Sequence, residues 1–223
     1  MHGVKKSLRA QGFSHRSVER LALYRRALLD RSPAWDTHVY SHQLAYACGV
    51  SAAQVRRDLM AIGYTGSPST GYETECLLDS LGRFLDAPEP TPTAIAGVGQ
   101  LGGALLSFLV NRHPKLGIVA AFDVNPSKTD RVLYGVRCYP MHRLHEIVDA
   151  CRISVAVLAV PAKEAQAVCE KFVASGVRGI LSFAPVFLRL PKHVAVERLD
   201  VTIALEKVAF LARSVSRSRR TFP

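Results

Sequence analysis

The chain has 223 residues, of which 48% are hydrophobic, and a formal net charge of +11. This length and hydrophobic fraction are enough for a hydrophobic core in each of two modest domains. The longest apolar runs fall short of the ~18 residues of a membrane span, and the basic N-terminus lacks the apolar stretch of a signal peptide, so we expect a cytoplasmic protein that does not contact membranes. The five cysteines lack zinc-ligand spacing and predict no metal site. The positive charge favours a polyanionic partner.

Basic residues gather at both ends of the chain. We expect residues 1–17 to form a flexible basic arm and the Ser/Arg-rich end to be disordered. The charges in question are Lys5, Lys6 and Arg9 at the front, and Arg213, Arg217, Arg219 and Arg220 at the back. After the arm, residues 18–30 carry apolar side chains at helical spacing, and Ser32-Pro33 ends the predicted helix.

Two short helices separated by a tight Gly-Val-Ser turn are predicted within residues 40–62. Ser41 is suited to cap the first helix, which Gly49 ends, and Ser51 to cap the second. A helix-turn-helix of this kind places its second helix in the major groove of DNA. The polar face of that helix carries an amide and two guanidinium groups, which suit base edges and phosphates. These groups belong to Gln54, Arg56 and Arg57.

Residues 63–72 predict a glycine-rich turn between two short strands, the wing of a winged helix. A helix over residues 76–85 then closes a DNA-binding domain that spans 18–85. The predicted DNA contacts are Ser51, Gln54, Arg56, Arg57, Tyr64 and Thr65. A helical protein-interaction module is the alternative for this part of the chain. Three prolines follow and predict a linker over residues 86–92, since proline does not continue a helix.

The strongest motif is Gly97-Val-Gly-Gln-Leu-Gly102, which follows a short apolar run and precedes a helical segment. Strand, glycine turn and helix in this order are typical of a dinucleotide site. Gly97 makes the tight turn, Gly99 lets the backbone approach a pyrophosphate, and Gly102 allows close helix packing. Asp123 ends the next apolar strand, where a carboxylate accepts hydrogen bonds from ribose hydroxyls, which favours NAD over NADP. A capping or turn aspartate is the alternative.

The rest of the chain, over residues 93–200, reads as a Rossmann-like domain of alternating helices and strands. We predict helices over 143–150 and 162–175 and buried parallel strands over 153–160 and 179–186. Ligands bind at the carboxyl ends of such strands, so residues 160–162 and 183–185 face the nicotinamide, unless they are simple turns. The predicted cofactor-binding residues are Gly97, Val98, Gly99, Gln100, Leu101, Gly102, Asp123, Val160, Pro161, Phe183, Ala184 and Pro185.

Two other functions compete with DNA binding. An NAD-dependent oxidoreductase, or a CoA-binding Rossmann enzyme domain with an appended interaction module, could carry the same glycine turn. Hydride transfer to a polar substrate needs an acid or base beside the nicotinamide, and the strand ends Val160-Pro161 and Phe183-Ala-Pro185 offer apolar residues instead. We therefore predict no catalytic residues and no enzyme. A protein-interaction sensor without DNA binding is the third possibility.

The combination of these motifs resembles the Rex family of redox-sensing transcriptional repressors over roughly residues 18–211. The resemblance is specific because neither domain alone supplies these motifs in this order. They are Ala53-Gln-Val-Arg-Arg-Asp-Leu59, Thr70-Gly-Tyr72, Gly97 to Gly102, Ala121-Phe-Asp-Val124, Val160-Pro-Ala-Lys-Glu-Ala-Gln166, Gly179 to Val186 and Leu199-Asp-Val-Thr202.

The resemblance implies an α/β chain with an N-terminal winged helix-turn-helix domain, a Rossmann-like dinucleotide-binding domain and a C-terminal dimer-exchange helix. It also implies a homodimer in which residues 201–223 form that exchanged helix and a basic tail. Such a repressor binds double-stranded operator DNA, senses the NADH/NAD+ ratio, and leaves the operator when NADH binds.

This chain departs from the family pattern at three places. Ser67-Pro68-Ser69 replaces the usual basic residue of the wing. The family's switch resembles a contact among an arginine, an aspartate and a tyrosine, matched here by Arg26, Asp200 and, in place of the tyrosine, Phe108. Phenylalanine cannot donate a hydrogen bond. Ser182 stands where an asparagine usually precedes Phe-Ala-Pro. A weaker response to NADH, or a response to another signal, is therefore expected.

Overall fold

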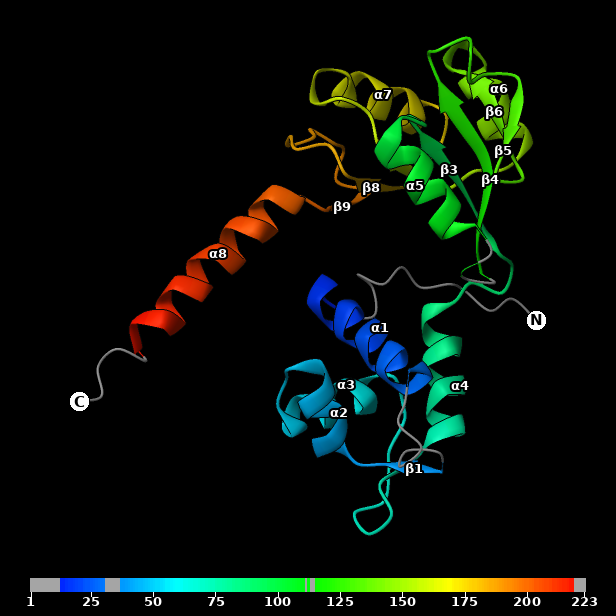
Figure 1. Cartoon of the computed structure of the whole chain (residues 1–223). Helices are drawn as coiled ribbons and strands as arrows, with labels where there is room; N and C mark the ends of the chain where they lie inside the picture. The colour runs from blue at the N-terminus through cyan, green and yellow to red at the C-terminus, as the bar shows by residue number, and fades with distance from the viewer. Residues whose placement is uncertain (1–12, 31–36, 111, 113–114, 219–223) are drawn as a thin grey trace. The chain divides into compact units, whose positions relative to one another are not determined.

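The computed structural model describes residues 13–30, 37–110, 112 and 115–218 (Figure 1). The chain divides into two compact units, Met1–Pro88 and Glu89–Pro223. The division falls within the segment expected as a linker, but Thr91 and Pro92 of that segment already belong to the first strand of the second unit. Within the described ranges, no helix is both long enough and apolar enough to cross a membrane.

The first unit packs four helices around one core. They are α1 (His15–Leu29), α2 (Ser41–Cys48), α3 (Ala52–Ala61) and α4 (Thr74–Leu85). The core consists mainly of Leu21, Tyr24, Leu28, Val39, Leu44, Val55, Leu59, Tyr72, Leu77 and Leu81. Helix α1 begins earlier than predicted because the hydroxyl of Ser14 accepts a hydrogen bond from the Ser17 backbone N–H at 3.2 Å. The expectation that residues 15–17 belong to a flexible arm was therefore wrong, and residues 1–12 of the arm lie outside the described residues.

Caps fix the turn between α2 and α3. Gly49 ends α2 with a left-handed φ of 65°, and the Ser51 hydroxyl accepts from the Gln54 backbone N–H at 3.1 Å. Both features follow the prediction. The prediction that Ser41 caps α2 was wrong, since Ser41 is already helical and Tyr40 occupies the cap position. The Tyr40 backbone N–H is satisfied by the side chain of Gln43 at 2.7 Å.

The wing differs from the expected hairpin. A two-stranded antiparallel sheet joins β1 (His38–Val39), which precedes the helix-turn-helix, to β2 (Tyr72–Glu73), which follows the wing. The two arms of the wing meet at a single bridge between Ser67 and Gly71. The strand after the wing therefore pairs with an earlier segment, because the turn itself is too rich in glycine, proline and serine to form a long ladder.

The described part of the second unit contains a seven-stranded sheet in the order β5-β6-β4-β3-β7-β8-β9. The strands are β3 (Thr91–Ala96), β4 (Leu116–Asp123), β5 (Arg131–Leu133), β6 (Val136–Pro140), β7 (Val155–Leu158), β8 (Gly179–Ser182) and β9 (Ala195–Arg198). All neighbours are parallel except β5 and β6. The six parallel strands follow the order of a Rossmann fold, whose chain reverses direction across the sheet between β3 and β7.

Alternate residues of the central strands face two separate cores. Ala94, Ala96, Phe122 and Leu158 pack with α6 (Leu144–Ala150) and α7 (Ala162–Ala174), whereas Ile95, Ala121 and Val157 pack with α5 (Gln100–Leu109). A 3-10 turn, Met141–Arg143, leads into α6. This period of two explains why the buried strands read as continuous apolar runs in the sequence.

Helix α8 (Val201–Ser218) ends the described chain. Several large apolar side chains along it are mostly exposed, including Val201, Leu205, Val208 and Leu211. The helix extends into the Ser/Arg-rich segment that was expected to be disordered, so that expectation was wrong up to Ser218. Arg219 and Arg220 lie outside the described residues.

Candidate functional site

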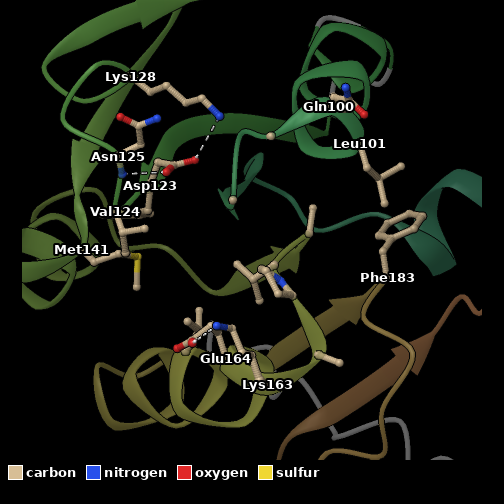
Figure 2. Close-up of a pocket in the computed structure, with 18 of the residues that line it drawn as sticks. Gln100, Leu101, Asp123, Val124, Asn125, Lys128, Met141, Lys163, Glu164 and Phe183 are labelled. Atoms are coloured by element: carbon tan, nitrogen blue, oxygen red, sulfur yellow. Dashed lines mark hydrogen bonds and ion pairs between the residues drawn. The ribbon is translucent and has the colours of Figure 1, made fainter.

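A cavity of about 1020 Å³ lies at the carboxyl ends of β3, β4 and β7, where the strand order reverses (Figure 2). The glycine turn after β3 forms one part of its wall, and the turn between β7 and α7 forms another. This is the edge at which an open parallel sheet binds ligands. Its volume falls at the upper end of the range for ligand pockets, which is roughly 300–1,000 Å³.

Each glycine of the turn has a separate structural reason. Gly97 has a φ of +84°, and a Cβ there would lie 2.5 Å from the Ala159 carbonyl oxygen. A Cβ on Gly102 would lie 1.7 Å from the Gly97 carbonyl oxygen. At Gly99, by contrast, a Cβ would meet no protein atom within 4 Å, and this residue lines the cavity. The first and third glycines are thus required by packing, while the second leaves the backbone open toward the cavity.

Asp123 joins the glycine turn to the end of β4. Asp123 is 9% exposed, and its carboxylate accepts a hydrogen bond from the Val98 backbone N–H at 2.9 Å. It also accepts from the Asn125 backbone N–H at 2.8 Å (Figure 2). Lys128 donates to the Val98 carbonyl oxygen at 3.1 Å, and its Nζ lies 3.9 Å from Asp123 Oδ2. Asp123 therefore stabilises the loops at Val98 and Asn125, and it also lines the cavity.

Most of the residues predicted to bind a cofactor line the cavity. They are Gly97, Gly99, Gln100, Leu101, Asp123, Val160, Pro161, Phe183 and Pro185. The structure does not place the other three in the wall: Gly102 packs on the glycine turn, Val98 is 6% exposed, and Ala184 is 2% exposed. Ser182, at the position of the usual asparagine, is fully buried, and its hydroxyl accepts from the Ala184 backbone N–H at 3.3 Å.

Several polar residues of the wall were not among the predicted cofactor-binding residues. Asn125 and Lys128 follow β4, while Lys163 and Glu164 begin α7 and lie at the other side of the cavity (Figure 2). The Lys163 Nζ lies 3.9 Å from the Glu164 carboxylate, and both side chains are mostly exposed. Lys163 and Glu164 closely follow Pro161 at the end of a predicted strand, and this position could have indicated that they line the cavity. The prediction included only the residues at the strand end itself.

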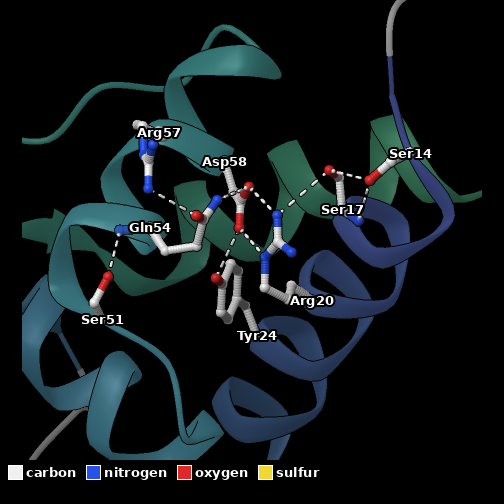
Figure 3. A network of polar contacts seen from close by, with 8 residues as sticks. All are labelled: Ser14, Ser17, Arg20, Tyr24, Ser51, Gln54, Arg57 and Asp58. Atoms are coloured by element: carbon white, nitrogen blue, oxygen red, sulfur yellow. Dashed lines mark hydrogen bonds and ion pairs between the residues drawn. The ribbon is translucent and has the colours of Figure 1, made fainter.

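The second candidate site is the exposed face of α3. Arg56 and Arg57 are exposed and Gln54 is half-buried. Arg56 donates to the Ser41 hydroxyl on α2 at 3.0 Å. Arg57 donates to the Gln54 side-chain oxygen at 2.9 Å, as Figure 3 shows. The structure thus brings Gln54 and Arg57 into contact, whereas Arg56 is bound to α2.

Asp58 lies beneath this face and was not predicted. Its carboxylate is 5% exposed and forms a bidentate ion pair with Arg20 of α1, with distances of 2.6 and 2.7 Å (Figure 3). It also accepts from the Tyr24 hydroxyl at 2.9 Å and from the Gln54 amide at 2.8 Å. Burial raises the pKa of the Asp58 carboxyl, but the hydrogen bonds from Arg20, Tyr24 and Gln54 outweigh burial and hold the pKa below its usual value.

The two predicted wing residues differ in burial. The hydroxyl of Tyr64 donates to the Glu73 carbonyl oxygen at 3.2 Å, and its ring packs 6.1 Å from that of Tyr72. Burial raises the pKa of Tyr64. Thr65 is exposed, as are Ser67, Pro68 and Ser69 at the tip of the wing.

The three predicted switch residues each have a local partner. Arg26 pairs with Asp30 one helical turn later on α1. Asp200 caps α8, because its carboxylate accepts from the backbone N–H groups of Thr202 at 3.0 Å and Ile203 at 3.2 Å. The ring of Phe108 is 56% exposed, with the Arg112 guanidinium 4.4 Å from its centroid. Arg26 belongs to the first unit, and Phe108 and Asp200 belong to the second.

Two family models match the chain. Residues 13–59 match a putative DNA-binding protein N-terminus, and residues 88–186 match a CoA binding domain. The fold is similar to that of RSP, a Rex-family repressor. Its structure with β-NADH has a TM-score of 0.82 at 24% identity and covers 94% of this chain and 99% of that chain. Its structure with β-NAD+ and operator DNA has the same TM-score and identity, and covers 93% and 96%.

Curated relatives extend the similarity at the level of sequence. The redox-sensing transcriptional repressor Rex of Streptomyces avermitilis is 35% identical over 91% of this chain and 80% of its own length. Rex of Levilactobacillus brevis is 37% identical over 87% of this chain and 92% of its own length. Both relatives are named as regulators rather than enzymes. With a helix-turn-helix, a Rossmann-type cavity and relatives of this identity and coverage, the chain belongs to the Rex family of redox-sensing transcriptional repressors.

Proposed function

We propose that this chain represses transcription by binding double-stranded operator DNA, and that it releases the DNA when NADH binds the second unit. One observation carries the proposal: the same chain contains a helix-turn-helix with exposed guanidinium groups and a large cavity bordered by a glycine turn. A chain that only bound a nucleotide would have no need of the first feature. The family membership supports the same function, and a repressor of this kind acts in the cytoplasm.

The cavity is assigned to NADH and NAD+ on its shape and charge. The pyrophosphate would lie against the backbone at Gly99, which leads into the N-terminus of α5, where N–H groups attract anions. The Asp123 carboxylate would accept hydrogen bonds from the adenosine ribose. Val160, Pro161, Phe183 and Pro185 would surround the nicotinamide end. Because these residues are apolar, they favour the uncharged ring of NADH over the positively charged ring of NAD+.

Helix α3 is assigned to the major groove. Arg56 and Arg57 would contact bases or phosphates, and Ser51 at the start of the helix would lie near the backbone of the DNA. Tyr64 and Thr65 at the start of the wing would contact the adjoining phosphates. The family's basic wing residue is replaced by Ser67-Pro68-Ser69, so the wing would contribute less charge to DNA binding.

A homodimer formed through α8 is supported by the apolar side of that helix. Val201, Leu205, Val208 and Leu211 recur at helical spacing and are 71%, 66%, 58% and 53% exposed. Large apolar side chains that recur on one helix face usually pack against another chain. A second copy of the chain is the proposed partner, and two copies would place two α3 helices on successive turns of the DNA.

The switch is proposed to involve Arg26, Asp200 and Phe108. A charged pair that forms in one state of the dimer and not in the other biases the equilibrium between the states. In the described structure both charges have local partners, Asp30 for Arg26 and the start of α8 for Asp200. Phe108 supplies a ring but no hydroxyl, which would weaken the response to NADH relative to a tyrosine.

The test is retention of the full-length protein on duplex DNA with and without cofactor. Genomic fragments selected by the purified protein at moderate salt supply the probe. We expect saturating NADH to release the selected duplex and equal NAD+ to leave most of it bound. Failure to enrich any genomic fragment would overturn DNA-binding repression, and release by both nucleotides alike would overturn redox sensing. Steady oxidation of NADH with an added substrate would favour an oxidoreductase instead.

A further inference from the structure

The amide of Gln54, which the sequence predicted as a DNA contact, is held between Asp58 and Arg57. The Gln54 Nε2 donates to Asp58 Oδ1 at 2.8 Å, and the Gln54 Oε1 accepts from Arg57 Nη2 at 2.9 Å (Figure 3). The three side chains therefore form a chain of hydrogen bonds that runs from the interior of the first unit to its surface.

The direction of these hydrogen bonds is fixed at the buried end, by Asp58. An ionised carboxylate can only accept hydrogen bonds, and the pKa of Asp58 is lowered, so the group is ionised at neutral pH. Gln54 must therefore turn its nitrogen toward Asp58 and its oxygen toward Arg57. Arg20 and Tyr24, both from α1, hold Asp58 in place with three further hydrogen bonds.

The exposed end of this series of hydrogen bonds is the guanidinium of Arg57, which has further N–H donors. Arg57 uses one of its five N–H groups on Gln54, so a parallel pair remains available. Such a pair matches the O6 and N7 acceptors of guanine, the most common specific contact in the major groove. Arg56, on the same helix, donates to Ser41 of α2 and has no part in this chain.

We propose that Gln54 and Asp58 are positioning residues that hold Arg57 for a guanine in the operator, so that Arg57, and not Gln54, determines base preference at that position. The inference rests on the proposed function, because it requires that α3 bind DNA. Holding the guanidinium before binding lowers the entropy lost when it contacts the base. The preference for guanine therefore depends on residues that do not touch DNA.

The experiment measures base preference with the full-length protein in the absence of NADH. A duplex library with a randomised centre, selected by the parent protein, yields the site, and duplexes carrying each base at each position then give relative affinities. A shuffled duplex measures affinity that is independent of sequence. Arg57→Lys keeps the charge but loses the parallel donors, so it identifies the position that Arg57 reads.

Gln54→Met tests the positioning role, because it keeps the length of the side chain and leaves Asp58 bound to Arg20 and Tyr24. We expect it to reduce the guanine preference at the Arg57 position by about tenfold, within the 1–3 kcal/mol of a bidentate base contact. Affinity for the shuffled duplex and the thermal midpoint should stay at parental values. Asp58→Asn should reduce the same preference, because an amide at 58 no longer fixes the orientation of Gln54.

Arg56→Ala is the matched control, and it should weaken binding to every duplex by a similar factor. A parental guanine preference in Gln54→Met would overturn the inference, because Arg57 would then need no support. A loss confined to an adenine at a different position would also overturn it, because Gln54 would then read the base itself. If the parent protein enriches no sequence and does not bind the shuffled duplex, the proposed function fails, and this inference fails with it.

Discussion

Asp58 of the first unit and Asp123 of the second are both buried carboxylates, but their hydrogen-bond partners differ in kind. Asp58 is bound by side chains, two of which come from α1, more than thirty residues away in sequence. Asp123 is bound by backbone N–H groups of the loops beside it, and the Lys128 Nζ lies 3.9 Å from its carboxylate.

Asp58 thus joins helix α3 to helix α1, whereas Asp123 borders the cavity. Removing Arg20 leaves the buried Asp58 charge without its bidentate partner, which is among the more costly changes in a protein interior. Asp123 lines a cavity that water can enter, so its N–H partners can be solvated if the carboxylate is lost. We therefore expect changes around Asp58 to act mainly on stability and changes around Asp123 to act mainly on binding.

The largest effect is expected for Arg20→Met. This change leaves the Asp58 carboxylate buried without its bidentate partner and should lower the free energy of unfolding by about 3 kcal/mol. Urea denaturation followed by circular dichroism measures it. The control is Arg83→Met, which breaks the exposed pair with Asp79 and should cost less than about 0.5 kcal/mol. Equal losses in the two variants would show that Asp58 is not a structural anchor.

The same ion pair predicts a dependence on pH. The pKa of Asp58 is lower in the folded protein than in the unfolded chain, so its contribution is complete above the unfolded value and is lost as pH falls through the folded value. Unfolding measured from pH 6 down to pH 2 should show this loss in the parent protein. Asp58→Asn should start from lower stability and lose less on acidification. An unchanged pH slope in the variant would contradict the assignment.

The next effect concerns the glycine turn. Gly99→Val should weaken NADH binding by about 100-fold while the protein stays folded, because a Cβ at this cavity-lining position would meet no protein atom within 4 Å. Gly102→Ala should instead disrupt the fold, since its Cβ would lie 1.7 Å from a carbonyl oxygen. Calorimetric titration and thermal unfolding of both variants separate the two roles. Normal NADH binding by Gly99→Val would place the pyrophosphate elsewhere.

A smaller effect is expected in the choice between NADH and NADPH. The Asp123 carboxylate should repel a 2′-phosphate and make NADH bind more tightly by about tenfold. Because Lys128 lies beside this carboxylate, Lys128→Met should increase the preference, and Asp123→Ser should reduce it. Calorimetry with both nucleotides is the measurement. Equal affinities in the parent protein would show that the carboxylate serves only the loop.

The smallest effects are expected at the proposed switch. Asp200→Asn removes the charge but keeps a side chain that caps helices well, so α8 should remain intact. NADH-driven release from DNA should then fall by a few-fold, whereas NADH binding alone should not change. Phe108→Tyr should strengthen release by about twofold through its added hydroxyl. Operator affinity with and without saturating NADH tests both variants, and parental release in Asp200→Asn would exclude this pair.

The sequence predicted the elements of the fold better than its pairings. The buried strands and the glycine turn were identified because their patterns are local and dictated by packing. Strands β5 (Arg131–Leu133) and β9 (Ala195–Arg198) were missed, since their side chains are mostly exposed and show little alternation. Strand β6 (Val136–Pro140) was also missed, although buried Val136 and Cys138 flank exposed Arg137, because so short a run gives a weak pattern. The pairing of His38–Val39 with Tyr72–Glu73 was also missed, because residues so far apart in sequence give no local signal.

The candidate sites were predictable to a similar extent. Residue types at strand ends and on a polar helix face indicated the cavity and the exposed face of α3. The role of Asp58 could not be predicted, because it depends on where α1 packs, and the motif Arg-Arg-Asp-Leu reads equally well as a solvated helix face. Lys163 and Glu164 were overlooked because whether a side chain at the start of a helix faces a cavity depends on the tertiary arrangement.

Helix α1 connects two of these features mechanically. Arg20 and Tyr24, which hold Asp58, share with Arg26 a single helix that has no glycine or proline between His15 and Leu29. At 1.5 Å per residue, Arg26 lies about 9 Å along the axis from Arg20. An uninterrupted helix of this length moves as a rigid body. A displacement of α1 at Arg26 would therefore also move Arg20 and Tyr24, which bind Asp58. Displacement of Arg26 would then shift Asp58 and Gln54, and with them the guanidinium of Arg57.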